Sequence, residues 1–297
     1  MSQRTNGREI SVSVGVPVRN GARFLAETLD SLLAQSYNDF ELLISDNAST
    51  DETEKIGRAY EARDPRVRFL RSNVDLGLAG NYNLLYQQAR GKYFKWAAAD
   101  DLHDPDYLKL CVEVLERDPS VVLAYGKSRF IDENGKPMAE SDPGFDLQED
   151  EARERLRYVI RSKRWVNAIF GLIRADALAR TPLLPEYPSG DYTILGDLAV
   201  LGKFVEVPEV LFSRRLHPGA SSQNLSDANW LAHFWSGGNA DVDGRLVFWN
   251  RSYGHAKTIM HSRLGLGEKL SLTGSLLRTM ITGRRRLLAE LKSKCFS

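Results

Sequence analysis

Apolar segments alternate with amphipathic segments over about the first 125 residues of the chain. Short β-branched runs that stop at a polar residue, a proline or a glycine are typical of buried strands. Between them, apolar side chains recur three and four positions apart, which is the spacing of one helix face. The predicted strands are residues 11–17, 40–45, 67–71, 92–98 and 121–126, and the predicted helices include residues 22–36, 78–89 and 104–117.

A further helix is expected after the second strand, within the sequence NASTDETEKIGRAYEA. Ser49 or Thr50 is expected to cap it, because Asp51 and Glu52 in its first turn would complement the helix dipole. Strands that alternate with helices of roughly 10–15 residues predict βαβ units. The fold class is therefore α/β, with a mostly parallel sheet and helices on both of its faces.

After about residue 126 the regular alternation is lost. Asn134 and Gly135 predict a turn between two short strands. The other expected elements are a helix over residues 149–160, a strand, turn and helix over 164–180, a helix over 190–204, and several short helices from about 227.

Composition excludes several classes of protein but does not identify a function. The chain has 297 residues and a net charge of +1, which gives no electrostatic reason to expect nucleic-acid binding. Its two cysteines, Cys111 and Cys295, exclude a disulfide scaffold and a cysteine-rich zinc cluster, and they fit a reducing compartment. The first residues lack the apolar core of a signal peptide, and no apolar run approaches the roughly 20 residues of a membrane span. A soluble cytoplasmic protein is expected.

Candidate chemistry lies where the predicted strands end. Residues 17–21 follow the first strand, Asp46 to Ser49 follow the second, and Asp100 and Asp101 follow the fourth. In open parallel sheets, ligands bind beyond the carboxyl ends of the strands. No GxGxxG or GxxxxGK[ST] sequence is present, so the usual dinucleotide and P-loop phosphate sites are excluded. Two adjacent carboxylates could face a diphosphate only with a divalent cation between them.

A plain structural interpretation of these aspartates stays open at this point. An aspartate at a strand end is often a turn or helix-cap residue, and this alternative applies to Asp46 and to the Asp100-Asp101 pair. Repulsion between adjacent like charges needs compensation, which favours a ligand site for the pair. Asp104 and Asp106 are expected only to cap the helix that begins near Pro105.

Three blocks of sequence together resemble the family 2 glycosyltransferases, which have the GT-A fold. They are SVGVPVRNGARFLAETLDSLLAQSYNDFELLISDNASTDET, GKYFKWAAADDLHDPDYL, and GDYTILGDLAVLGKF followed by LFSRRLHPGASS. The likeness covers roughly residues 10–220. It implies a GT-A, Rossmann-like domain over residues 1–220, with a nucleotide-binding half at 8–126 and an acceptor and catalytic half at 127–220. Residues 221–297 would form a helical C-terminal extension.

Carried over position by position, the resemblance implies a role for nine residues. Those expected to bind the nucleotide-sugar are Pro17, Arg19, Asn20, Asp46, Asn81 and Asp100. Those expected to hold a divalent metal, Mn²⁺ or Mg²⁺, are Asp101 and His217. Asp191 would be the catalytic base. The chain departs from the family pattern at three places, where Arg19 replaces an aromatic residue and Ala98 and Gly190 replace acids.

The residues leave alternatives for several of these roles. Asp191 could be a helix N-cap, Asp197 is a rival base on the same helix, and His217 could have a packing role. Arg214 and Arg215 could neutralise phosphate or be solvated. A set of aromatic residues could form an acceptor groove or the core of a helical subdomain: Trp230, Phe234, Trp235, Phe248 and Trp249.

The resemblance implies metal-assisted transfer of a sugar by single displacement with inversion. The expected donor is a UDP-sugar and the acceptor a hydroxyl group of a glycan or a lipid-linked molecule. One alternative is a catalytically silent nucleotide- or sugar-binding protein of the same fold. Another is a sugar nucleotidyltransferase, which usually needs a glycine-rich basic loop where this chain has VPVRNGARF.

The C-terminal segment is basic. From Arg263 onward it has eight Lys or Arg and two Glu, with leucines interleaved at helical spacing. A basic amphipathic helix can lie on an anionic membrane surface, which would place the protein at the inner face of the membrane. The alternative is a helix that packs on this domain or on a second subunit of a homo-oligomer.

Overall fold

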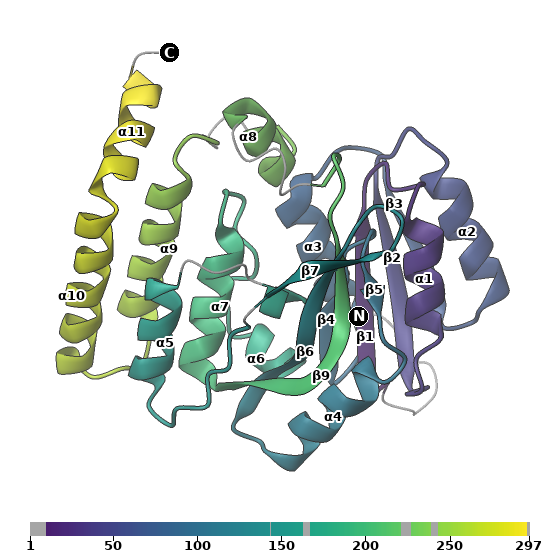
Figure 1. Ribbon diagram of the computed structural model, residues 1–297, viewed down its shortest axis with the longest axis horizontal. Coiled ribbons are helices and arrows are strands. Elements are labelled where there is room, and N and C mark those ends of the chain that lie inside the picture. Colours follow the sequence, from purple (N-terminus) through teal and green to yellow (C-terminus); the bar gives the residue numbers. More distant parts are fainter. Residues whose placement is uncertain (1–9, 143, 163–166, 221–226, 239–242, 296–297) are drawn as a thin grey trace, which may run out of the picture.

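The computed structural model describes residues 10–142, 144–162, 167–220, 227–238 and 243–295. A central sheet is flanked by helices, and the last helices of the chain are stacked at one side of it (Figure 1).

Within the described residues the sheet has nine strands in the order β3-β2-β1-β4-β8-β6-β9-β5, with β7 paired to β6. Their bounds are β1 Val12–Val18, β2 Phe40–Asn47, β3 Val67–Ser72, β4 Tyr93–Trp96, β5 Leu102–His103, β6 Val121–Ile131, β7 Pro137–Asp142, β8 Leu172–Arg174 and β9 Lys203–Arg215. The neighbours within β3-β2-β1-β4 are parallel, and so are β6 and β9. Strand β8 is antiparallel to both β4 and β6.

The predicted α/β class with flanking helices is confirmed, and the sheet is mixed. The parallel part that the sequence predicts ends at β4, because the short strand β8 inserts between β4 and β6 from a distant part of the chain. With three residues, β8 is too short to show a strand period. The predicted hairpin at Asn134-Gly135 is the β6–β7 connection, in which Gly135 has a φ of 79°.

The helices match the predicted segments. Their bounds are α1 Leu25–Leu33, α2 Thr53–Arg63, α3 Gly77–Gln88, α4 Tyr107–Arg117, α5 Ala152–Arg161, α6 Ala175–Leu178, α7 Gly190–Leu201, α8 Ala228–Ser236, α9 Val247–His261, α10 Leu266–Thr282 and α11 Arg284–Cys295, with a 3-10 turn η1 at Asn167–Phe170.

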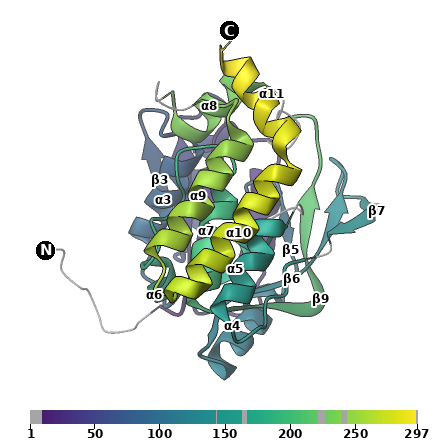
Figure 2. The ribbon, with the colours of Figure 1, turned by 90° about the vertical axis from the view of Figure 1, so that its left-hand side faces the viewer.

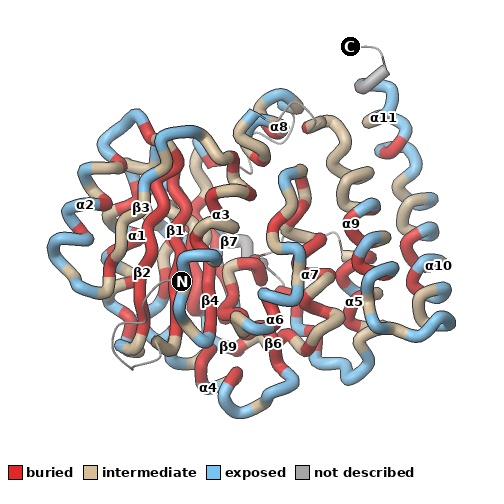
Figure 3. The backbone as a smooth tube through the Cα atoms, turned by 180° about the vertical axis from the view of Figure 1, so that it is seen from behind, coloured by how far each residue is buried: buried red, intermediate tan, exposed pale blue. Residues whose placement is uncertain are grey.

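Two apolar layers enclose the sheet. On one face the valines of β1, among them Val14 and Val16, pack in one core cluster with Leu29 of α1 and Leu108 of α4. On the other face α3, α6 and α7 pack against β4 and β6, with Trp96 of β4 fully buried. The central strands β1, β2 and β4 are buried along their length, whereas the outer sides of the helices are exposed (Figure 3). This continuous burial explains why the strands read as apolar runs rather than alternating ones.

The predicted cap of α2 is wrong. The helix begins at Thr53, and its N-cap is Glu52 without a side-chain cap bond. The Ser49 hydroxyl instead accepts a hydrogen bond from the Asn20 amide nitrogen at 2.8 Å, and the Thr50 amide donates to Asn20 Oδ1 at 2.8 Å. These polar residues therefore join the loop after β2 to the loop after β1.

The C-terminal helices pack on the sheet domain through distinct contacts. Helix α8 contacts α3, α9 contacts α7, and α10 contacts α5 and α9. Trp235 of α8 joins the core cluster beneath α3, and Glu290 of α11 accepts hydrogen bonds from the backbone at the start of α9. Among the helices that the structure describes, none has both the length and the hydrophobicity to cross a membrane.

We predict that the same substitution, Gly→Ala, has opposite effects on stability at two glycines within helices. A Cβ on Gly57 of α2 would lie 2.2 Å from Cε2 of Phe69, whereas a Cβ on Gly274 of α10 would meet no atom within 4 Å. Gly274→Ala should raise the free energy of unfolding by about 0.5–1 kcal/mol through helix propensity. Gly57→Ala should lower it by about 1–2 kcal/mol, because the gain in propensity is smaller than the cost of overpacking against Phe69.

Urea unfolding of both variants checks this pair. A gain in stability at both positions would show that the Phe69 ring moves aside at little cost.

Candidate active site

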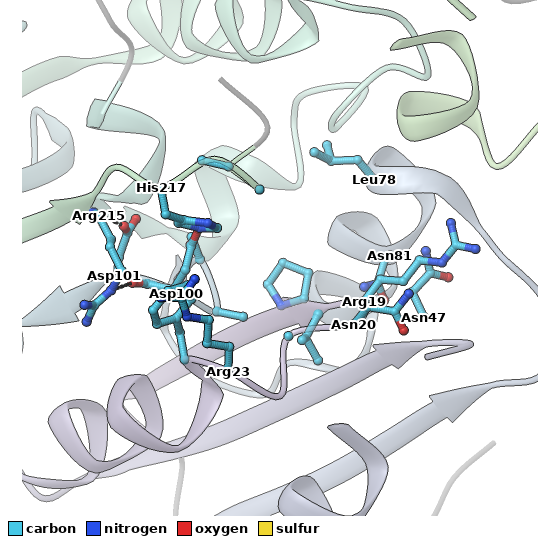
Figure 4. Close-up of a pocket in the computed structure, with 18 of the residues that line it drawn as sticks. Arg19, Asn20, Arg23, Asn47, Leu78, Asn81, Asp100, Asp101, Arg215 and His217 are labelled. Atoms are coloured by element: carbon cyan, nitrogen blue, oxygen red, sulfur yellow. Dashed lines mark hydrogen bonds and ion pairs between the residues drawn. The ribbon is translucent and has the colours of Figure 1, made fainter. Parts of the chain in front are cut away.

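A cleft of about 490 Å³ opens where β1 and β4 end. Its lining comes from several segments that are distant in the sequence, and Figure 4 shows many of their side chains. These segments are residues 17–24 at and after the end of β1, Asn47 at the end of β2, the region of Asp75 to Tyr82 including the start of α3, residues 98–101 after β4, Phe170, residues 214–220 at and after the end of β9, and Phe234 of α8. The cleft is therefore at the sheet edge that the sequence predicted.

The loop after β1 is held in an unusual backbone conformation. Asn20 has a φ of 51°, in the left-handed region that asparagine tolerates better than most residues. The next two amides donate to side chains of the loop after β2, Gly21 to Thr53 Oγ1 at 3.0 Å and Ala22 to Asp51 Oδ2 at 3.1 Å. Hydrogen bonds from Thr53 and Ala22 lower the pKa of Asp51, although its partial burial acts in the opposite direction. Hydrogen bonds to the residues that follow β2 thus fix the wall of the cleft that contains Pro17, Arg19 and Asn20.

The two adjacent carboxylates lie together with His217. Asp101 is 3% exposed, and its Oδ1 accepts a hydrogen bond from the Arg215 backbone nitrogen at 2.8 Å. Asp100 Oδ2 lies 3.0 Å from His217 Nε2, and the imidazole packs on the Phe24 ring with centroids 4.7 Å apart. Burial, and then the charge of Asp100, raise the pKa of Asp101 well above its usual value. All three residues line the cleft (Figure 4).

Arg215 helps to hold Asp100 and Asp101 in place. Its guanidinium group is 1% exposed, and it donates to the Asp100 carbonyl at 2.8 Å and to Glu27 Oε2 at 2.7 Å. It also lies over the Phe24 ring, 4.7 Å from the centroid. Arg215 is therefore buried, contrary to the solvated alternative, and its guanidinium group already has protein partners.

Arg214 is differently placed from its neighbour. It lines the cleft, donates to Asn167 Oδ1, and its charge opposes the burial that raises the pKa of both Asp101 and Asp191. A guanidinium group that acts on both carboxylates marks them as parts of one electrostatic site.

Asp191 is close to this site but is not among the residues that line the cleft. It lies in the first turn of α7 and accepts a hydrogen bond from the Tyr192 amide at 3.0 Å. The N-cap of α7 is Ser189, so the N-cap alternative for Asp191 is wrong. Burial raises the pKa of Asp191, and the nearby Arg251 and Arg214 charges oppose this shift. Burial is also the main cause that raises the pKa of Tyr82, a lining residue, and the charges of Asp100, Asp101 and Asp191 add to it.

The rival base Asp197 faces another helix. Its Oδ1 accepts a hydrogen bond from Thr258 Oγ1 of α9, and burial raises its pKa to about 6. It is not among the lining residues of the cleft.

Asp46 and Asn81 are both engaged by protein partners. Asp46 is fully buried, accepts a hydrogen bond from the Ser49 amide at 2.9 Å and forms an ion pair with Arg71, and it does not line the cleft. Asn81 lines the cleft, but its amide group donates to the Ser45 carbonyl at 3.1 Å and accepts from the Ser45 hydroxyl. A base contact by Asp46 would therefore require its pair with Arg71 to open.

Sequence reasoning missed Asp75, which organises the wall opposite the carboxylates. Its carboxylate accepts hydrogen bonds from Asn47 Nδ2 at 2.8 Å and from the Gly77 amide at 2.9 Å, and it forms an ion pair with Arg19. His233 Nε2 of α8 lies 3.0 Å from Asp75 Oδ2. Asp75 precedes Gly77, whose φ of 67° marks a turn, but no sequence signal connects it with Arg19 or His233.

The family model described as glycosyl transferase family 2 matches residues 13–186. The chain belongs to this family. This family assignment confirms the resemblance found in the sequence.

Two relatives can be compared with the chain. The chain is 28% identical over 225 residues to a chondroitin synthase of Escherichia coli, a match that covers 75% of this chain and 31% of that protein. A chondroitin synthase of Pasteurella multocida is 27% identical over 225 residues, with 75% of this chain and 22% of that protein covered. The chain therefore spans less than a third of either relative.

Among solved structures, Staphylococcus aureus TarS 1–349 in complex with UDP-GlcNAc aligns with a TM-score of 0.72 and 15% identity, covering 95% of this chain and 79% of that one. The mannosyltransferase PcManGT from Pyrobaculum calidifontis, in complex with GDP-Man and Mn²⁺, aligns with a TM-score of 0.55 and 18% identity, covering 96% and 87%. At these identities the likeness shows the fold, which is GT-A.

The possible metal ligands at the cleft of this family 2 chain suit a hard cation that binds few protein side chains. In the part of the chain that the structure describes, no group of three or more His, Cys, Asp or Glu side chains is arranged to hold a metal ion. Asp101, Asp100 and His217 nevertheless offer oxygen and nitrogen donors at the cleft. Magnesium-type sites commonly take one or two carboxylates and complete their coordination with water and phosphate. A cation would also relieve the repulsion that raises the pKa of Asp101.

The shifted pKa of Asp197 predicts a pH-dependent effect of Asp197→Asn on stability. Because the pKa of the folded state, about 6, lies above the ordinary 3.8, the wild-type contribution is complete below pH 3.8 and is lost as the pH rises through 6. The variant keeps an acceptor for Thr258 without the charge. It should therefore be about 1–2 kcal/mol more stable than wild type at pH 8 and equal to it near pH 4, after allowance for the partial exposure of the carboxylate.

Urea unfolding at both pH values measures the effect. Glu209→Gln, which removes an exposed carboxylate of β9, is the control and should leave the pH dependence close to that of wild type. Equal stability of Asp197→Asn and wild type at pH 8 would contradict the assigned environment.

Proposed function

We propose that this family 2 chain is an inverting glycosyltransferase. It moves a sugar from a nucleotide-sugar, with UDP as the expected nucleotide, to a hydroxyl group of a glycan or lipid-linked acceptor. A divalent cation, Mn²⁺ or Mg²⁺, assists. The observation that carries the proposal is the convergence of Asp100, Asp101 and His217 at one end of the cleft, with Arg19 and Asn20 at the other (Figure 4).

The two ends of the cleft suit the two ends of a nucleoside diphosphate. The Arg19 guanidinium, held by Asp75, provides a planar cation next to Pro17 at the end proposed for the base. At the other end, Asp101 and His217 would hold the cation, and Arg214 provides a further positive charge for the diphosphate. The UDP-GlcNAc complex of TarS and the GDP-Man and Mn²⁺ complex of PcManGT, two proteins of the same fold, support a nucleotide-sugar as donor.

When bound, the cation would act as a Lewis acid and offset the negative charge that builds on the departing diphosphate. The remaining chemistry belongs to side chains of this chain. Arg214 stabilises the same developing charge from the cleft wall. Asp191 accepts the proton of the attacking hydroxyl group, and burial raises its pKa toward the range of a useful base.

Inversion follows from the number of available carboxylates. A single displacement needs one base, whereas a double displacement needs a second carboxylate as nucleophile at the anomeric carbon. Asp197, the other acid of α7, binds Thr258 of α9 and cannot serve this purpose in the observed conformation. The proposal therefore assigns one base and an inverted product.

Titration calorimetry tests nucleotide and metal binding together. UDP should bind wild type in the presence of Mn²⁺ more tightly than GDP or dTDP, and binding should weaken at least about tenfold without the metal. Asp101→Asn keeps an acceptor for the Arg215 amide but removes the charge, so it should abolish the effect of Mn²⁺. Asp104→Asn, an exposed aspartate on the same segment, is the matched control and should bind as wild type.

Binding of UDP that is the same with and without Mn²⁺ would contradict the role of the metal. If no nucleotide bound under any condition, the donor assignment would fail. Metal-dependent binding without any hydrolysis or transfer of the donor sugar would favour a silent nucleotide-binding protein.

Substitutions of the two aspartates of α7 test which of them is the catalytic base. Asp191→Asn should lower kcat by roughly 10²–10⁴ with little change in the KM for the donor, because the lost group acts on the acceptor proton. Asp197→Asn, on the same helix but directed at α9, should retain wild-type kcat. Donor turnover with and without added acceptor sugars provides the measurement, and the anomeric configuration of the product, read by NMR, reports inversion. Loss of activity in Asp197→Asn alone would reverse the assignment.

A further inference from the structure

The outer surface of α10 and α11 carries a continuous apolar stripe. Six leucine and isoleucine side chains on these helices are between 38% and 76% exposed. Within each helix they follow one another at intervals of three, four or seven residues, which places them on one side of that helix. They are Leu266, Leu270, Leu277, Ile281, Leu288 and Leu291.

This stripe is not the surface by which the two helices pack on the protein. The inner side of α10 buries Leu272 and Leu276 in a cluster with Leu156 of α5 and Ile259 of α9. The inner side of α11 buries Leu287, whose carbonyl accepts a hydrogen bond from Trp249 Nε1 at 3.1 Å. Figure 2 shows α10 and α11 in front of the other helices, with their outer side unobstructed by described parts of the chain.

The charges around the stripe are mostly positive. Basic residues that are exposed on or beside these helices are Arg263, Arg278, Arg284, Arg285, Arg286 and Lys292. The two acids of this region both accept hydrogen bonds from backbone amides, and Glu290 also forms an ion pair with Arg286 at 3.5 Å. Glu268 accepts from Gly265 at 2.8 Å, and Glu290 accepts from Phe248 at 2.9 Å. The surface therefore combines exposed leucines with a surplus of cations.

We propose that this face, defined by the six apolar residues and the basic residues around them, binds the surface of a lipid bilayer that carries anionic headgroups. An amphipathic helix with an apolar side and surrounding Lys and Arg lies in the interface plane, with its apolar side at the acyl boundary and its cations among the headgroups. A bilayer matches both properties of the face at the same time.

A second copy of the chain fits this face less well. In a two-fold symmetric dimer the same patch meets itself, so the arginines around one stripe would lie opposite those of the other. Burial of the leucines would then bring several like charges together with only two acids, Glu268 and Glu290, nearby, and both are already engaged within the chain.

The face is also suitably placed relative to the cleft. Helix α11 extends past α10 toward the end of the molecule where α8 lies (Figures 1 and 2), and Phe234 of α8 lines the cleft. A bilayer at α10 and α11 would therefore lie beside the end of the protein at which the cleft is found. The proposal itself does not depend on the transfer reaction.

Vesicle co-sedimentation of the full chain tests the proposal. Wild type should sediment with vesicles of mixed phosphatidylglycerol and phosphatidylcholine, should stay in solution with pure phosphatidylcholine, and should be released as salt is raised. Arg284→Ser with Arg285→Ser should weaken binding roughly fivefold per charge, which corresponds to about 1 kcal/mol each. Leu277→Glu with Ile281→Glu should abolish it.

Matched variants elsewhere on the surface separate this face from overall charge and hydrophobicity. Lys55→Ser with Lys109→Ser removes two exposed cations of α2 and α4, and Met138→Glu with Val210→Glu changes two exposed apolar residues of β7 and β9. Both controls should sediment as wild type does. Circular dichroism of all four variants should match wild type, because each changed residue is exposed.

Three results would overturn the proposal. The first is wild type that fails to sediment with anionic vesicles at low salt. The second is a Leu277→Glu, Ile281→Glu variant that sediments as well as wild type. The third is a light-scattering result in the absence of vesicles: wild type is a dimer and the Leu277→Glu, Ile281→Glu variant is a monomer. This result would show that the face binds a second copy of the chain.

Discussion

Two adjacent carboxylates at the end of a buried strand are the constraint on which the rest of the site depends. Asp101 is almost fully buried next to Asp100, so their repulsion must be offset by positive charge and hydrogen-bond donors. Residues more than a hundred positions later supply these groups. Arg215 donates its amide to Asp101 and its guanidinium to the Asp100 carbonyl, and His217 binds the Asp100 carboxylate. This requirement ties the end of β9 to the end of β4.

Because side chains alternate along β9, its two neighbouring arginines have different roles. Successive side chains of a strand point to opposite sides, so Arg214 and Arg215 contact different neighbours, although both line the cleft. Arg215 is directed at Glu27 and Phe24 and stiffens the support of the carboxylates. Arg214 is directed into the cleft, where its charge acts on both Asp101 and Asp191. A pair of basic residues that looks redundant in the sequence therefore has two distinct environments.

The C-terminal helices take part in the site as well as covering the domain. His233 of α8 contacts Asp75, which holds Arg19, and Phe234 lines the cleft. Arg251 of α9 lies over the Tyr192 ring, 3.7 Å from the centroid, and its charge opposes the effect of burial on Asp191. Residues that the sequence assigned to a separate extension thus contact one wall of the cleft, and one of them acts on the charge of the proposed base.

The sequence by itself determined the strands β1 to β4 and the start of β6, most helices, and the edge of the sheet where the polar residues gather. These features depend on local periodicity and on turn chemistry, which a single chain displays directly. It also indicated Asp100, Asp101 and His217, and the structure brings these three together. Only the tertiary structure decided that β8 inserts antiparallel beside β4, that Asp46 is paired with Arg71, and that Asp75 joins Arg19 to His233. Each of these depends on contacts between residues far apart in the chain, and such contacts are set by topology and close packing, which leave no periodic signal in the sequence.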